Sequence, residues 1–117
     1  MKVSIITLCY NSGHTISSSI SSVLEQTYED IECVIVDGGS TDNTVNMIKS
    51  YEKDFCGNMF WLTEPDDGLY DAMNKGITIA TGDLIGILNC DDTFFSKTVF
   101  QEIVNFHRLN NIEYNTP

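Results

Sequence analysis

Residues 84–95 read "LIGILNCDDTFF", an apolar run that ends abruptly on polar groups. The five apolar or glycine residues 84–88 are typical of a strand that is buried on both faces of a sheet. Asn89, Cys90 and two adjacent carboxylates, Asp91 and Asp92, follow at once. Neighbouring like charges disfavour each other's ionisation unless a positive group lies beside them. The strand therefore ends on a pair of charges that calls for a compensating partner.

The same pattern of a strand followed by polar residues occurs earlier in the chain. Residues 3–10 ("VSIITLCY") and 31–36 ("IECVIV") are continuous β-rich runs, and residues 59–63 predict a shorter strand. Between and after the strands, apolar residues recur at helical spacing and predict four helices. These helices carry Ile16, Ile20, Val23 and Leu24; Val45, Ile48 and Tyr51; Leu69, Ala72, Met73, Gly76, Ile77 and Ala80; and Val99, Phe100, Ile103 and Val104. Asp42 is the predicted N-cap of the second helix, and Gly82 is the predicted stop of the third.

Alternation of strands and helices predicts an α/β fold with an open, mostly parallel sheet and helices on both faces. Residues 1–117 are expected to form a single domain. In such a sheet the carboxyl ends of the strands share one edge, and ligands bind there where the strand order reverses. Three polar clusters should meet at that edge: residues 10–11, 37–40 and 89–92.

The acidic excess restricts the possible partners. Seventeen Asp and Glu against six Lys and Arg give a formal net charge of −11. Nucleic acids and anionic membranes are bound through Lys and Arg, so neither is expected as a partner. No stretch approaches the roughly 20 apolar residues that a transmembrane helix needs. The four cysteines lack CxxC spacing, which argues against a zinc site and predicts free thiols in a reducing, cytoplasmic setting.

Two sets of acidic residues are candidates for binding chemistry. Asp91 and Asp92 would suit a hard divalent cation such as Mg²⁺ or Mn²⁺, which prefers oxygen ligands; the alternative is that one of them caps the turn before the last helix. Asp37 ends a strand and precedes Gly38 and Gly39, so it could accept hydrogen bonds from a base or a ribose. The alternative for Asp37 is that it initiates an Asx-turn. GxGxxG and P-loop motifs are both lacking from the sequence.

Three stretches in this order and spacing resemble family 2 glycosyltransferases of the GT-A fold: "VSIITLCYN" (3–11), "IECVIVDGGSTDNT" (31–44) and "EPDDGLYDAMNKGITIATGDLIGILNCDD" (64–92). The resemblance extends over nearly the whole chain. It implies transfer of a sugar, with inversion, from a nucleotide-diphosphate donor to an acceptor. It also implies roles for individual residues in the donor site. Thr7, Leu8 and Tyr10 would border the nucleobase, Asp37 would contact it, and Asp67, Gly68 and Asp71 would belong to the same donor site.

The segment "NCDD" (89–92) stands where this family has its DxD metal motif. By resemblance, Asp91 would bind the metal and the diphosphate, with Asp92 beside it as a second metal ligand. Asn89 replaces the first aspartate of the motif and can still hydrogen-bond a ribose. The family's acceptor-binding half, which carries the catalytic base, has no counterpart here, so we expect a donor-binding part that is inactive by itself.

The resemblance also sets expectations for partners and location. A UDP-sugar would be the donor, with Mn²⁺ or Mg²⁺, and the acceptor would be a saccharide or a lipid-linked group in bacterial surface polysaccharide synthesis. The protein would work in the cytoplasm, at the cytoplasmic face of the membrane. Exposed apolar surface on such a partial domain favours self-association, so we expect a homo-oligomer.

Two other functions stay open at this point. A non-catalytic nucleotide-binding or assembly module would have the same donor-site sequence without the acceptor half. A metal-dependent phosphatase is suggested by "NCDDTF" (89–94), which loosely matches a DxDxT nucleophile loop. That loop belongs after a first strand and begins with Asp, whereas this one follows a late strand and begins with Asn89.

Overall fold

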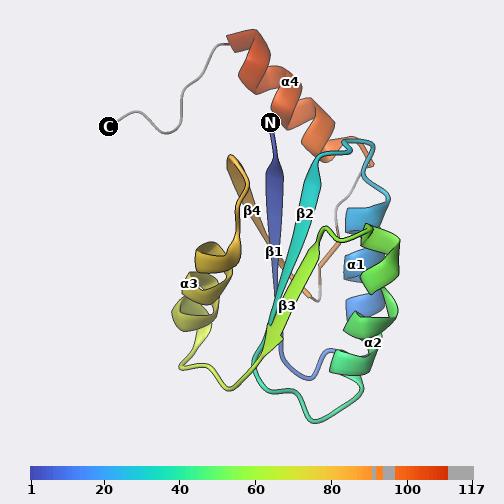
Figure 1. Ribbon diagram of the computed structural model, residues 1–117, viewed down its shortest axis with the longest axis vertical. Helices are drawn as coiled ribbons and strands as arrows, with labels where there is room; N and C mark the ends of the chain where they lie inside the picture. Colours follow the sequence, from blue (N-terminus) through green and yellow to red (C-terminus); the bar gives the residue numbers. More distant parts are fainter. Residues whose placement is uncertain (91, 94–96, 111–117) are drawn as a thin grey trace.

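Four parallel strands form the centre of the structure, in the order β3-β2-β1-β4 (Figure 1). The computed structural model describes residues 1–90, 92–93 and 97–110. The strands are β1 (Val3–Cys9), β2 (Ile31–Asp37), β3 (Met59–Thr63) and β4 (Leu84–Asn89). The predicted open, parallel α/β sheet is confirmed, and every pairing in it is parallel.

Helices cover both faces of the sheet. They are α1 (Ile16–Leu24), α2 (Thr44–Ser50), α3 (Leu69–Ile79) and α4 (Val99–Asn110), with a short 3₁₀ turn, η1 (Glu52–Phe55). Side chains of α1, α2 and α4 share one buried cluster with the strands, whereas α3 packs on the opposite face through a second cluster (Figure 1). None of these described helices is both long and apolar enough to cross a membrane.

The two central strands, β1 and β2, account for the continuous apolar runs of the sequence. Every residue of both strands is buried, because helices cover them on both faces. A strand in this position gains from apolar side chains at successive positions, and β-branched residues suit it best. The sequence pattern of these runs is therefore a consequence of their central place in the sheet.

The edge strand β4 differs from its prediction. We expected burial on both faces, but Ile85 is 42% and Ile87 is 44% exposed. Their neighbours Leu84 and Leu88 point to the opposite face and pack in the α1 cluster. Helix α3 packs against β1 and β2, and within the described residues it does not bury Ile85 and Ile87 on that face of β4. The prediction failed because an apolar run alone does not distinguish a central strand from an edge strand.

Close approach between elements explains two glycines. A methyl group on Gly76 would lie 2.5 Å from Ile6, so α3 can pack on β1 only with glycine at this position. A methyl group on Gly82 would lie 2.7 Å from the backbone nitrogen of Ser4. Gly82 thus allows the chain to pass close to β1 after α3, which ends at Ile79.

The start of α2 corrects a smaller prediction. Asn43, rather than Asp42, occupies the N-cap position, and its side chain makes no capping hydrogen bond. Asp42 nevertheless accepts a hydrogen bond from the backbone N–H of Thr44 at 3.0 Å. The Asp42 carboxylate therefore pairs with the N–H of the first residue of α2, although Asp42 lies one residue before the N-cap position.

A buried carboxylate ties the strands together at the amino end of the sheet. Glu32 of β2 has a side chain that is only 1% exposed. Its oxygens accept hydrogen bonds from the Ser4 hydroxyl at 2.6 Å and from the N–H and hydroxyl of Thr81, both at 2.9 Å. The ammonium group of Lys2 lies 3.6 Å away. Burial raises the pKa of Glu32, but these hydrogen bonds and the Lys2 charge outweigh it and lower the pKa below its ordinary value.

The lowered pKa predicts how stability depends on pH. A carboxyl whose pKa is lower in the folded state stabilises the protein fully above its unfolded pKa, about 4.3 for Glu. That contribution is lost as the pH falls through the folded-state value. Urea melts at pH 7 should show Glu32→Gln to be less stable by about 1–3 kcal/mol, since the hydrogen bonds to a charged acceptor weaken. The difference from wild type should shrink below about pH 4; a constant difference down to pH 3 would contradict this role.

Candidate functional site

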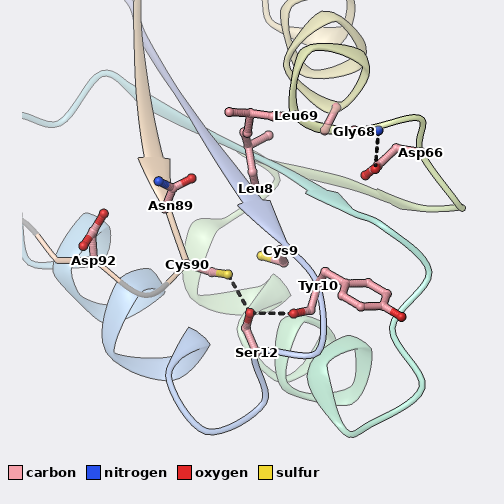
Figure 2. A pocket seen from close by; sticks show the side chains of 11 residues that line it. Leu8, Cys9, Tyr10, Ser12, Asp66, Gly68, Leu69, Asn89, Cys90 and Asp92 are labelled. Carbon is pink, nitrogen blue, oxygen red and sulfur yellow. Dashed lines mark hydrogen bonds between the residues drawn. The ribbon is translucent and has the colours of Figure 1, made fainter.

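The strand order reverses between β1 and β4, and a cleft of about 550 Å³ opens at their carboxyl ends (Figure 2). Ligands of open α/β sheets bind at this kind of position. Three segments line the cleft: the end of β1, the approach to α3 with its first turn, and the end of β4. Their lining residues are Leu8, Cys9, Tyr10 and Ser12; Asp66, Gly68, Leu69 and Ala72; and Asn89, Cys90 and Asp92.

Buried thiols join the ends of β1 and β4. The N–H of Cys90 donates to the carbonyl of Leu8 at 3.2 Å, and the Cys90 thiol donates to the Ser12 hydroxyl at 2.8 Å (Figure 2). The hydrogen bond with Cys90, and then burial, raise the pKa of the Cys9 thiol far above its ordinary value. A thiol that stays protonated is a poor nucleophile, so we assign Cys9 no nucleophilic role; Cys9 and Cys90 both line the cleft.

Ser19 of α1 holds the turn that follows β4. Its buried hydroxyl shares one proton between the carbonyl oxygens of Cys90, at 2.7 Å, and Asp92. The N–H of Asp92 donates to the carbonyl of Asn89 at 2.9 Å, which closes the turn. Sequence analysis did not assign Ser19 a role. Its spacing from Ile16 and Ile20 was a usable signal, because it places this serine on the buried side of α1.

The loops after β1 and β2 meet as predicted. The N–H of Asn11 donates to the Ser40 hydroxyl at 2.7 Å, and the Asn11 side-chain oxygen accepts from the N–H of Thr41 at 2.8 Å. Asn11 has a φ of 47°, a left-handed conformation that asparagine tolerates better than most residues. These hydrogen bonds hold Tyr10 at the rim of the cleft, where the residue is 61% exposed.

Asp37 lies beneath the surface and does not line the cleft. It is fully buried, and its carboxylate accepts hydrogen bonds from the N–H of Ser40 at 2.8 Å and the hydroxyl of Thr63 at 2.7 Å. The Ser40 hydroxyl also donates to it. Asp37 thus holds the loop after β2 through the N–H three residues further on, whereas the predicted Asx-turn would use the N–H two residues on. Its contact with a nucleobase stays a prediction.

The segment before α3 separates two adjacent acids. Asp66 is partly buried and lines the cleft, whereas Asp67 is exposed and does not. The N–H of Asp67 donates to the carboxylate of Asp71 at 2.9 Å, and Lys75 lies 3.3 Å from the same carboxylate. The hydrogen bond from Asp67, followed by that from Lys75, lowers the pKa of Asp71. Asp71 therefore organises the start of α3 outside the cleft.

Five of the predicted donor-site residues line one cleft: Leu8, Tyr10, Gly68, Asn89 and Asp92. Thr7 is buried in β1 behind this surface. Asp91 lies outside the described residues. Sequence analysis missed six lining residues, although each neighbours or nearly neighbours a predicted one: Cys9, Ser12, Asp66, Leu69, Ala72 and Cys90.

The oxygen atoms at the end of β4 could supply some of the ligands of a hard cation. Asn89 and Asp92 present an amide oxygen and a carboxylate to the same cleft, and Mg²⁺ is commonly held by few carboxylates together with substrate phosphates. Among residues 1–90, 92–93 and 97–110, no group of three or more His, Cys, Asp or Glu forms a candidate metal site. A cation here would need additional oxygens from a ligand or from Asp91.

Comparisons with known sequences agree on one family. The family described as Glycosyl transferase family 2 matches residues 4–114. An uncharacterized glycosyltransferase of Mycobacterium tuberculosis (strain ATCC 25618 / H37Rv) is 39% identical over 103 residues, which cover 87% of this chain and 38% of that protein. A PGL/p-HBAD biosynthesis glycosyltransferase of Mycobacterium bovis (strain BCG / Pasteur 1173P2) is 32% identical, over 88% of this chain and 40% of the relative. The chain thus spans less than half the length of these relatives.

Solved structures share the fold. Residues 1–349 of S. aureus TarS in complex with UDP match with a TM-score of 0.85 and 25% identity, over 95% of this chain and 33% of that one. The mannosyltransferase PcManGT of Pyrobaculum calidifontis, solved with GDP-Man and Mn²⁺, matches with a TM-score of 0.83 and 24% identity. That match covers 91% of this chain and 32% of PcManGT.

Proposed function

Because the chain belongs to glycosyl transferase family 2, we propose that it forms the donor-binding part of an inverting glycosyltransferase. The cleft between β1 and β4 would hold a nucleotide-diphosphate sugar. The observation that carries this proposal is the position of the cleft: it lies at the reversal of strand order, within the residues that match the family.

The chemistry of the cleft walls supports a nucleotide ligand. The exposed ring of Tyr10 offers a flat surface for a base. Gly68, with a φ of 105°, leads directly into the first turn of α3, and the free N–H groups of a helix start favour phosphate. Asn89 and Asp92 complete the opposite wall. Base, diphosphate and sugar would extend from Tyr10 toward the end of β4.

The proposed reaction is a single displacement at the sugar. An acceptor hydroxyl attacks the anomeric carbon, the bond from that carbon to the diphosphate oxygen breaks, and the configuration inverts. The hydroxyl proton passes to a base that we assign to no residue of this chain. A divalent cation held by Asp91 and Asp92 would, when bound, neutralise the charge that develops on the leaving diphosphate. Asn89 would hydrogen-bond the ribose.

We propose a UDP-sugar as the donor and a saccharide or lipid-linked group as the acceptor, in surface polysaccharide synthesis at the cytoplasmic face of the membrane. The TarS structure with UDP supports a uridine donor for this fold and sequence. The relatives named as PGL/p-HBAD biosynthesis glycosyltransferases support a role in a biosynthetic glycosylation step.

A non-catalytic nucleotide-binding module is the second candidate. The observation that favours it is the chemistry of the cleft walls, because no residue that lines the cleft in the described part of the chain is assigned as a catalytic base. Sugar transfer to an acceptor, assayed with UDP-sugars and Mn²⁺, distinguishes the two. A phosphatase is not supported, since the acidic turn follows β4, an edge strand late in the chain.

The metal proposal predicts the behaviour of Asp91 variants. Calorimetry should show that wild type binds UDP more tightly with Mn²⁺ than with EDTA, because the cation offsets repulsion between the acids and the diphosphate. Asp91→Ala should abolish this difference, and Asp91→Asn should nearly do so, since it keeps the shape and loses the charge. A role in capping a turn would instead cost about 0.5–2 kcal/mol of stability in urea melts and leave UDP affinity unchanged.

The matched control is Asp83→Asn, at the other end of β4. Asp83 accepts a hydrogen bond from the Lys2 backbone at 3.0 Å, far from the cleft along the same strand. This variant changes the net charge equally and should retain metal-dependent binding. Undiminished metal dependence in Asp91→Ala would contradict the assignment of Asp91.

We also propose that the chain self-associates through β4. This strand has one neighbour among the described strands. Charged side chains and proline usually protect a strand edge from pairing with another chain, and residues 84–89 contain neither. Ile85 and Ile87 expose apolar surface beside that edge. Two copies related by a twofold axis could pair their β4 strands, since such an interface is self-complementary.

Sedimentation velocity tests this proposal. A dimer should form, and added salt should strengthen it, because salt screens the repulsion between two chains of charge −11. Ile87→Lys should shift the protein to monomer. The control is Ile103→Lys, since Ile103 is comparably exposed, at 40%, on α4. A monomeric wild type from low to high salt would rule out association through this edge.

A further inference from the structure

A buried hydroxyl connects helix α1 to the turn after β4. Ser19 is 0% exposed, and its hydroxyl donates to the carbonyl oxygens of Cys90, at 2.7 Å, and Asp92. These two carbonyls belong to the residues on either side of Asp91 in the sequence. Ser19 is not among the described residues that line the cleft. It therefore contacts the acidic segment from the core side, where a ligand in the cleft does not reach it.

The contact is a property of position 19 and not of the serine-rich helix as a whole. The hydroxyls of Ser17 and Ser21 are hydrogen-bonded to the hydroxyl of Tyr51, the C-cap residue of α2. The hydroxyl of Ser22 donates to the carbonyl of Ser19 within the same helix. Ser19 differs from these three because it faces the sheet and meets the backbone that follows β4.

The two ends of the turn are attached in different ways. At the strand end, the Cys90 thiol donates to the Ser12 hydroxyl at 2.8 Å. At the far end, the N–H of Asp92 donates to the carbonyl of Asn89 at 2.9 Å. That bond closes the turn but attaches it to no other element. The Ser19 hydroxyl thus supplies the link between the Asp92 end and a rigid helix.

An anchored backbone matters because Asp92 lines the cleft beside Asn89 (Figure 2). Metal ligands must be held at distances that are defined to about 0.2 Å. Asp91 and Asp92 are adjacent in sequence, and two like charges favour an arrangement that separates them until a cation binds. A turn without an anchor could relax in this way.

We propose that Ser19 is a positioning residue for the acidic turn. It holds the backbone of Asp92 so that the carboxylate stays at the cleft, and it thereby sets the affinity for a divalent cation. This inference rests on the proposed function, and it adds a residue that touches neither the donor nor the cation.

Hydrogen exchange in the metal-free protein tests the anchoring step. Ser19→Ala removes both hydrogen bonds to the turn, so the Asp92 amide should exchange at least about tenfold faster than in wild type, because the turn opens more often. Ser4→Ala is the matched control. Ser4 is equally buried, and its hydroxyl is hydrogen-bonded to Glu32 and to the N–H of Gly82 at the amino end of the sheet. This variant should leave exchange at Asp92 unchanged.

Mn²⁺ binding in the presence of excess UDP tests the functional step, with free Mn²⁺ measured by its EPR signal. Ser19→Ala should weaken Mn²⁺ binding by about 10- to 100-fold, the usual effect of removing a group that orients metal ligands. Ser19→Cys keeps a weak donor of similar size and should lie between alanine and wild type. The affinity for UDP measured with EDTA should stay unchanged in both variants, because Ser19 does not line the cleft.

Comparison with Ser4→Ala separates positioning from stability. Urea melts should show that Ser4→Ala and Ser19→Ala are folded and similarly destabilised, yet Ser4→Ala should bind Mn²⁺ like wild type. Should Ser19→Ala unfold, Ser19→Cys serves for the same comparison.

Four results would overturn the inference. They are an unaltered exchange rate at Asp92 in Ser19→Ala, an unchanged Mn²⁺ affinity in that variant, an equal loss of Mn²⁺ affinity in Ser4→Ala, and an equal loss of UDP affinity with EDTA. If wild type binds no UDP, the proposed function fails, and exchange at Asp92 still decides whether Ser19 anchors the turn.

Discussion

The parallel pairing of β1 with both β2 and β4 is the constraint on which the rest of the structure depends. Leu8 of β1 pairs with Val36 on one side and with Asn89 on the other. Three strands therefore end at the same level, and each is followed by a polar loop. Because β1 is buried on every side, these strand ends cannot shift independently. The cleft is built at this edge because the core beneath it is rigid.

Hydrogen bonds between the loops that follow these strands fix the shape of the cleft. Asn11 joins the first loop to the second through Ser40, and Ser19 joins α1 to the turn after β4. Asp37 is buried below these loops, and its carboxylate accepts hydrogen bonds from Ser40 and Thr63. Among the residues that the structure describes, the acids at the surface of the cleft are Asp66 and Asp92, which lie on opposite sides of it (Figure 2).

The central part of the fold could be predicted from sequence, but the finer placement of the site could not. The runs at 3–10 and 31–36 are apolar at successive positions because β1 and β2 are covered on both faces. The run at 84–88 looks the same, yet β4 is an edge strand with Ile85 and Ile87 exposed. Which neighbours a strand has is decided by tertiary packing. Likewise, "EPDD" does not reveal that Asp66 faces the cleft and Asp67 does not, since that depends on the turn that ends at Gly68.

Amide chemical shifts measured during titration of the ¹⁵N-labelled chain with UDP and Mg²⁺ test the central claim most directly. If the cleft between β1 and β4 is the donor site, the largest changes should fall on Tyr10, Ser12, Gly68 and Asn89. Amides around another hollow, which lies at the amino end of the sheet near Tyr28 and Phe55, should stay unchanged. Changes confined to that hollow, or no changes at saturating UDP, would contradict the account.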